Sequence, residues 1–139
     1  MEKIMKVKNK DISYFIATIK FYQQKLTKAN KYVDPRIAYL FGRDLRILEN
    51  EVQDFEEAKD ELLRVYGSIK TDPEDANKTY YSISKKENPD NFDRFKEEVD
   101  KLGNIEHEIT IFTENFEEFD NPFTFEDLCQ LWFLMDREN

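Results

Sequence analysis

Residues 35–66 read PRIAYLFGRDLRILENEVQDFEEAKDELLRVY, and this stretch decides the fold class. Apolar side chains recur in it in alternating steps of four and three residues, which is the spacing of a heptad seam along one helix face. The helix seam comprises Phe41, Leu45, Leu48, Val52, Phe55, Leu62 and Tyr66, with Lys59 at the one charged position. Asp34 and Pro35 suit the start of a helix, and Gly67 suits its end. We therefore expect a single helix of 32 residues, about 48 Å long.

A helix of this length needs partners for its apolar face. An earlier helix is indicated after Asn9, which is expected to cap it, and this helix ends near Thr27–Asn30. Its apolar stripe comprises Ile12, Phe15, Ile16, Ile19, Tyr22 and Leu26. We favour an antiparallel helical hairpin in which the two stripes pack together within the chain. The alternative is a seam shared with a second copy or with another protein.

The remaining segments predict shorter elements. Residues 3–8 favour one short edge strand, with Ile4 and Val7 between lysines, and Glu106–Thr113 alternates as a strand does. Between them, Ser68–Lys86 is either a loose β-hairpin or a mobile loop, and a third helix begins at Asn88-Pro89 and stops at Gly103. The sequence Thr124-Phe125-Glu126-Asp127 resembles a capping box for a last helix. That helix is expected to bury Leu128, Leu131, Trp132 and Met135.

The predicted fold class is mainly α, of the α+β type. It combines a long helical hairpin, a small two- or three-stranded antiparallel sheet and a short C-terminal helix. The 139 residues suit one domain, in which residues 1–67 form the hairpin with its N-terminal strand and residues 68–139 form a small α+β part.

Composition excludes several classes of protein. The chain is 40% hydrophobic, which is enough for a core and too much for chain-wide disorder. No stretch reaches the length of a membrane span, and the N-terminal residues lack the apolar core of a signal peptide. Cys129 is the only cysteine, so no intrachain disulfide can form. A reducing compartment, the cytosol of a host cell, is therefore expected, with no membrane partner.

Catalytic signatures are missing from the sequence. The three glycines stand alone, so no phosphate-binding loop is indicated, and one His with one Cys cannot build a structural zinc site. We expect His107 to be an ordinary strand residue and Cys129 to pack on an apolar helix face. The carboxylates of the long helix suit a solvated surface. No enzyme activity, catalytic residue, metal or cofactor is therefore predicted.

Charge is distributed unevenly along the chain. Residues 1–48 carry 11 basic and 4 acidic side chains, a net charge of +7, whereas residues 49–139 carry 10 basic and 26 acidic ones, a net charge of −16. The two parts could fold together and neutralise each other. Alternatively, the basic half could bind nucleic acid with help from Tyr14, Tyr22 and Tyr32, although the total of −9 repels a polyanion and argues against a nucleic-acid partner.

The third interpretation of the charge is our working hypothesis. An acidic surface with exposed aromatic side chains, Phe123 among them, would occupy a basic site on a partner protein. Its residues are Glu114, Phe116, Glu117, Glu118, Phe119 and Asp120.

Three segments resemble a known group of proteins. Residues 6–12 (KVKNKDI), 39–52 (YLFGRDLRILENEV) and 55–67 (FEEAKDELLRVYG) are similar to short, acidic, largely helical proteins encoded by phages and prophages of low-GC Gram-positive bacteria. The strand at Glu106–Phe112 and the helix at Phe125–Met135 match the order of elements in that group. Residues 72–77 depart from it, because they lack the glycine that is usual in the turn. The resemblance brings no catalytic residues and implies a phage protein that works by binding other proteins.

Three functions follow as hypotheses. The first is an anti-defence, anti-CRISPR-like inhibitor that blocks a nucleic-acid-handling host factor through the acidic surface. The second is a virion or assembly component, or a chaperone, that self-associates through the helix seam as a homodimer or larger oligomer. The third is a nucleic-acid binder that uses the basic N-terminal half.

Overall fold

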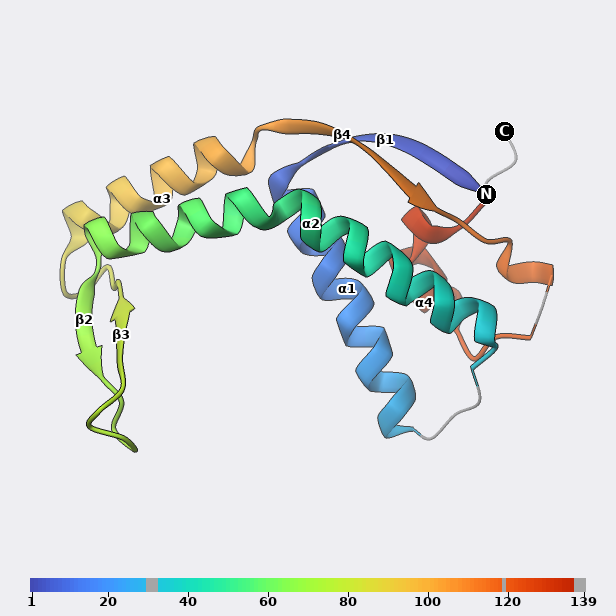
Figure 1. Ribbon diagram of the computed structural model, residues 1–139, viewed down its shortest axis with the longest axis horizontal. Coiled ribbons are helices and arrows are strands. Elements are labelled where there is room, and N and C mark those ends of the chain that lie inside the picture. The colour runs from blue at the N-terminus through green and yellow to red at the C-terminus, as the bar shows by residue number, and fades with distance from the viewer. Residues whose placement is uncertain (30–32, 119, 137–139) are drawn as a thin grey trace. The chain divides into compact units, whose positions relative to one another are not determined.

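The structure is a computed structural model that describes residues 1–29, 33–118 and 120–136 (Figure 1). It confirms the predicted α+β class, with strands that pair in two separate two-stranded antiparallel sheets. The elements in chain order are β1 (Glu2–Lys8), α1 (Asn9–Lys28), α2 (Pro35–Tyr66), β2 (Ser68–Thr71), β3 (Thr79–Ser82), α3 (Pro89–Gly103), β4 (Glu106–Phe112), the 3-10 turn η1 (Phe116–Glu118), α4 (Phe125–Gln130) and the 3-10 turn η2 (Trp132–Leu134).

The chain forms two compact units. Unit 1 consists of Met1–Val52 together with Glu106–Asn139, and unit 2 consists of Gln53–Ile105. The boundary crosses helix α2, whereas the sequence suggested a division after residue 67. The prediction of a single domain stays a prediction.

Strands β1 and β4 bring the two ends of unit 1 together, as the blue and orange ribbons of Figure 1 show. The register places Lys6 opposite Glu108 and Lys8 opposite Glu106 on one face of the sheet. The other face of β4 carries Ile109 and Ile111, both buried, as the alternation of the sequence predicted. The edge strand expected over residues 3–8 is present as β1, and its inward side chains are Lys3, Met5 and Val7. Successive strand residues face opposite sides, and Ile4 lies on the exposed one.

Helix α1 begins one residue earlier than a cap at Asn9 requires. Lys8 occupies the cap position, where its backbone N–H donates to Asp11 Oδ2 (3.0 Å), while Asn9 is a buried residue inside the first turn. The expected apolar stripe is otherwise confirmed, since all its members except the half-buried Ile16 are buried.

Helix α2 has the predicted bounds. Asp34 Oδ1 accepts a hydrogen bond from the backbone N–H of Arg36 (2.9 Å), so the carboxylate caps the helix ahead of Pro35. The buried stripe comprises Ile37, Leu40, Phe41, Asp44, Leu48, Val52 and Phe55. Leu45, Leu62 and Tyr66 of the helix seam are half-buried. The buried face of α2 therefore includes the carboxylic acid Asp44, whereas the predicted helix seam had Leu45 at this point.

The C-terminal part of unit 1 completes its core. The capping box is confirmed, because Thr124 Oγ1 accepts from Asp127 N (3.2 Å) and Asp127 Oδ2 accepts from Thr124 N (2.9 Å). Leu131, Phe133 and Leu134 are fully buried, and Phe133 stacks on Phe15 with ring centroids 4.1 Å apart.

The expected burial of four residues around the last helix is only partly correct. Leu131 is buried, but Leu128, Trp132 and Met135 are half-buried. Helix α4 ends at Gln130, and the tighter turn that follows it changes the side-chain period, so Phe133 and Leu134 face the core instead.

Unit 2 contains the β2–β3 hairpin, and this resolves the question that the sequence left open for Ser68–Lys86. Position 67 requires glycine because two backbone oxygens lie close to its Cα. An added Cβ would lie 2.5 Å from Leu63 O and 2.8 Å from Ser82 O. Helix α3 starts at the predicted cap, where Asn88 Oδ1 accepts from Asn91 N (3.1 Å).

Candidate functional site

The acidic surface predicted from the sequence is an ordered turn that follows β4. Its central aromatic residue, Phe116, is 1% exposed and stacks on the half-buried Phe123 with ring centroids 5.9 Å apart. The expectation of an exposed aromatic anchor at Phe116 is therefore wrong. Phe123 also lies against the rings of Tyr22 and Phe41, so both phenylalanines belong to the core. The prediction for Phe119 lies outside the described residues.

Side-chain amides hold this turn on both sides of Phe116. Asn115 Oδ1 accepts a hydrogen bond from Glu117 N (3.1 Å), and Asn121 Nδ2 donates to Phe116 O (2.8 Å). Glu118 N donates to Asn115 O at 3.1 Å. These hydrogen bonds order the backbone of residues 115–118 and join it to Asn121, and the side chains Glu117, Glu118 and Asp120 are exposed. We call these three residues the acidic turn.

Glu114 has a different role from the acidic turn. It is half-buried, and its backbone pairs with the C-terminal segment, because Glu114 N donates to Leu134 O (3.0 Å) and Glu114 O accepts from Asp136 N (2.9 Å). Arg36 lies within electrostatic range of Glu114 and Glu118, and its pKa is raised by the hydrogen bond to Asp34 first and by these two carboxylates in addition. The acidic turn therefore has one cationic neighbour at the start of α2.

A second surface was not predicted from the sequence. Helix α4 lies along α1, since Tyr14 Oη donates to Gln130 Oε1 (3.3 Å) and Asp127 Oδ1 contacts both Tyr22 Oη (3.0 Å) and Lys25 Nζ (3.4 Å). Large aromatic side chains on these helices remain exposed: Tyr14, Phe21 and Phe125. The sequence could have indicated this surface, because Tyr14 and Phe21 lie seven residues apart in the helix and outside the apolar stripe of α1.

Cys129 also differs from expectation, because it is exposed on α4 rather than packed in the core. A helix of six residues buries only one narrow face, and in α4 that face is occupied by Asp127.

Burial raises the pKa of Asp127, but the hydrogen bonds that its carboxylate accepts from Thr124, Tyr22 and Lys25 lower it, and the pKa lies below its usual value. Burial and the hydrogen bond to Asp127 raise the pKa of Tyr22 to about 12.

Asp44 is a titratable group in an unusual environment. It is fully buried; Oδ1 accepts a hydrogen bond from Phe112 N (2.8 Å), and Oδ2 has no hydrogen-bond partner among the described residues. Burial raises the pKa of Asp44 to about 6, although the Phe112 N–H, the Arg43 guanidinium and the N-terminal ammonium group all lower it. Asp44 lies three residues after Phe41 and four residues before Leu48. This helical spacing could have indicated from the sequence that position 44 lies on the buried face.

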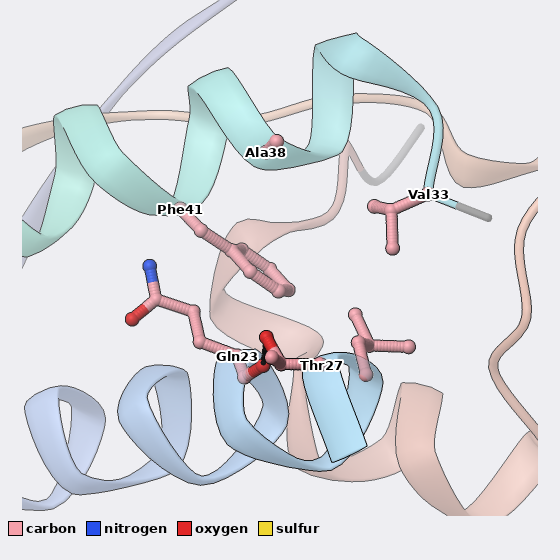
Figure 2. Close-up of a pocket in the computed structure, with 6 residues that line it drawn as sticks. Gln23, Thr27, Val33, Ala38 and Phe41 are labelled. Carbon is pink, nitrogen blue, oxygen red and sulfur yellow. Dashed lines mark hydrogen bonds between the residues drawn. The ribbon is translucent and has the colours of Figure 1, made fainter. Parts of the chain in front are cut away.

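A pocket lies between α1 and the first turns of α2 (Figure 2). Its volume is about 350 Å³, and it is lined by Gln23, Leu26, Thr27, Val33, Ala38 and Phe41. Figure 2 shows the Phe41 ring pointing into the space between the two helices. Among the described residues, the lining offers one amide and one hydroxyl group and no titratable side chain. His107 lies in β4, opposite Val7, as a strand residue.

The helix seam is divided between the two units. Phe41, Leu48 and Val52 are buried in unit 1, and Phe55 is buried in unit 2. Lys59 is half-buried and contacts Glu56 at 3.2 Å. The use of this seam by a second copy or a partner stays a prediction.

The charge division along the sequence is not a division between the units. Unit 1 contains 12 basic and 16 acidic residues, a net charge of −4, and unit 2 contains 9 basic and 14 acidic residues, a net charge of −5. Ion pairs join the basic and acidic parts within unit 1, as between Lys20 and Glu49 (3.8 Å) and between Lys25 and Asp127 (3.4 Å). The basic and acidic parts of the sequence are therefore partly neutralised by each other within unit 1.

Comparisons with the models of known protein families, with curated proteins and with solved structures found no match. Within residues 1–29, 33–118 and 120–136, no helix is both long enough and apolar enough to cross a membrane. The same part of the chain contains no group of three or more His, Cys, Asp or Glu side chains arranged to hold a metal ion.

Proposed function

We propose that this chain is a non-catalytic phage accessory protein that binds another protein stoichiometrically and inhibits it. The target would be a host factor of a defence system that handles nucleic acid and therefore has a basic groove. The observation that supports this proposal is the acidic turn, in which Glu117, Glu118 and Asp120 are exposed and side-chain hydrogen bonds of Asn115 and Asn121 hold the backbone at Glu117 and Phe116.

The physical argument concerns the cost of ordering a binding surface. A flexible acidic segment would lose conformational entropy on docking, whereas a turn that is already fixed by hydrogen bonds and by the buried Phe116 loses little. Three exposed carboxylates on such a turn attract a basic groove and accelerate the encounter. Phe116 contributes by holding the turn and not by contacting the target, which corrects the role that we had expected for it.

The test compares charge reversals at two places on the chain. The variant Glu117→Lys, Glu118→Lys, Asp120→Lys changes the acidic turn, and the control Glu51→Lys, Asp54→Lys, Asp60→Lys makes the same change of charge at exposed positions of α2. Each tagged protein is incubated with lysate of a low-GC Gram-positive host, and retained proteins are quantified by mass spectrometry.

We expect the wild type and the control to retain one basic protein at near-equal stoichiometry, and the acidic-turn variant to lose it. Titration of the captured factor with the wild-type chain should then abolish its nucleic-acid-directed activity at one equivalent. Equal retention by all three proteins, or no specific retention by any of them, would contradict the proposal. Far-UV circular dichroism of the variants verifies that each remains folded.

The second candidate function is a virion or assembly role that depends on self-association. It is favoured by one specific observation, the open outer edge of strand β1, which is developed below. Presence of the chain in purified phage particles, together with oligomers in solution, would support it.

A further inference from the structure

Strand β1 has an outer edge whose backbone groups are unpaired within the described residues. Met1 and Thr113 exchange two hydrogen bonds, from Met1 N to Thr113 O (3.1 Å) and from Thr113 N to Met1 O (2.8 Å). In an antiparallel ladder such pairs alternate with pairs that make no hydrogen bonds to each other. The register then directs the N–H and C=O groups of Glu2, Ile4 and Lys6 away from β4.

Two hydrogen bonds of neighbouring residues agree with this alternation. Lys8 N, at the end of the same outward series, donates to Asp11 Oδ2 (3.0 Å). On the other strand, Phe112 N points outward and donates to Asp44 Oδ1 (2.8 Å). The outer edge of β4 is thus partly occupied by α2, and further along by Leu134, which accepts from Glu114 N (3.0 Å). Among the residues that the structure describes, none forms a hydrogen bond with the outward backbone groups of Glu2, Ile4 and Lys6, whose side chains are all exposed.

The side chains of this edge are complementary to a second copy of themselves. If two β1 strands pair antiparallel about a twofold axis at Ile4, Glu2 of one copy lies opposite Lys6 of the other, and the two Ile4 side chains meet at the centre. The outward-facing residues of both copies coincide in this register, so Glu2, Ile4 and Lys6 all find hydrogen-bonding partners. Ile4 is 67% exposed in the single chain and would be covered by its symmetry mate. Helix α1 begins at Asn9, beyond the paired residues.

We propose that two copies of this chain form a homodimer by antiparallel pairing of their β1 strands, which creates a four-stranded sheet. A twofold interface uses the same patch on both copies, which is the commonest symmetry of soluble oligomers. Lysines on an edge strand usually oppose such pairing. Here Glu2 offsets Lys6 in the register that also brings the two Ile4 side chains together. The alternative register, with Glu2 opposite Lys8, would need the Lys8 N–H, which already donates to Asp11.

The interface consists of one short strand from each copy, so we expect a weak dimer with a dissociation constant in the micromolar range. The inference is independent of the proposed function, because the acidic turn takes no part in it.

Charge reversals provide the test. Glu2→Lys places two lysines opposite each other at both ends of the interface, and Lys6→Glu places two glutamates there. Each variant should therefore raise the dissociation constant of the homodimer about tenfold or more. An equimolar mixture of the two variants restores both opposite-charge pairs and should dimerise as the wild type does, as should the double variant Glu2→Lys, Lys6→Glu. Lys78→Glu, at an exposed position of unit 2, is the matched control and should leave the dissociation constant unchanged.

Sedimentation velocity over a concentration series at low salt measures the association, with any tag at the C-terminal end so that β1 stays free. Amide hydrogen exchange adds residue-level evidence. At high concentration the amides of Glu2, Ile4 and Lys6 should exchange more slowly, whereas those of Lys3 and Met5, which already face β4, should not change. Ile4→Pro removes the central outward N–H without removing a hydrogen bond to β4, and it should yield a monomer.

A wild-type chain that is monomeric at every concentration would overturn the proposal. A dimer that survives Glu2→Lys and Lys6→Glu unchanged would overturn it as well, because association would then use another surface. Failure of the mixture to restore dimerisation would exclude the register. Trp132 fluorescence verifies that unit 1 remains folded in each variant, so loss of the dimer is distinguished from loss of the fold.

Discussion

Replacement of Asp44 by asparagine should change how the stability of unit 1 depends on pH. Asp44 is fully buried, with one carboxylate oxygen bonded to Phe112 N and the other without a partner in the described part of the chain. Asparagine has nearly the same shape and keeps an oxygen that can accept from Phe112 N–H, but it does not ionise. The substitution therefore removes the titration of this site and leaves its main hydrogen bond in place.

The sign and the size of the effect follow from the pKa. Burial raises the pKa of Asp44 from the usual 3.8 to about 6, so the folded protein binds this proton more tightly than the unfolded chain does. Its favourable contribution is fully present below about pH 4 and is lost as the pH rises through about 6. About two pK units correspond to about 3 kcal/mol at most. The free energy of unfolding of the wild type, relative to Asp44→Asn, should thus fall by about 2–3 kcal/mol between about pH 4 and about pH 7.

Urea denaturation at a series of pH values, followed by the fluorescence of Trp132, measures this difference. Trp132 is the only tryptophan and lies in unit 1, so its signal reports the unit that contains Asp44. Subtracting the variant from the wild type cancels the titration of the other groups. Asp54→Asn, at an exposed position, is the control and should show no pH-dependent difference. A flat difference for Asp44→Asn, or one that grows with rising pH, would refute the reasoning.

Three further substitutions, one of them with a matched control, test the roles of individual residues. Gly67→Ala should destabilise unit 2 by about 1–3 kcal/mol, because the new Cβ would lie 2.5 and 2.8 Å from two backbone carbonyl oxygens; faster exchange of the hairpin amides checks this. Phe116→Ala should cost about 3–5 kcal/mol in urea denaturation, whereas Phe125→Ala, at a residue 82% exposed, should cost no more than about 0.5 kcal/mol; equal costs would contradict the assignment of Phe116 to the core. Thr124→Ala should cost about 1 kcal/mol by loss of the cap bond to Asp127 N, and an unchanged denaturation midpoint would exclude that role.

Features that depend on neighbouring residues could be predicted from the sequence. The start of α2 requires only the carboxylate of Asp34 beside Pro35, and the start of α3 requires only Asn88 beside Pro89. Both signals act within one helical turn, so no knowledge of the tertiary structure is needed to read them. The capping box at Thr124 is local in the same way, and it was predicted correctly.

Features that depend on distant segments could not be predicted in this way. Phe116 stands among acidic residues, which suggests exposure, yet Phe123 covers its ring and itself packs against Tyr22, a residue far away in the chain. Cys129 follows an apolar pattern, yet α4 ends at Gln130, before that pattern can face a core. The burial of Asp44 depends on the position of Phe112 N–H, which only the pairing of β1 with β4 determines.

The same long-range pairing changes the meaning of the charge asymmetry. A net charge of +7 on residues 1–48 and −16 on residues 49–139 suggests two surfaces of opposite sign. In the fold, β4 returns beside β1 and α4 returns beside α1, so glutamates lie opposite Lys6 and Lys8, and Lys25 contacts Asp127. The lysines of the N-terminal half are thus partly neutralised by the C-terminal segment, which weakens the argument for a nucleic-acid surface there. The carboxylates that most retain the features of a docking surface are those of the acidic turn, because they are exposed beside the backbone that Asn115 orders, with Arg36 as a cationic neighbour.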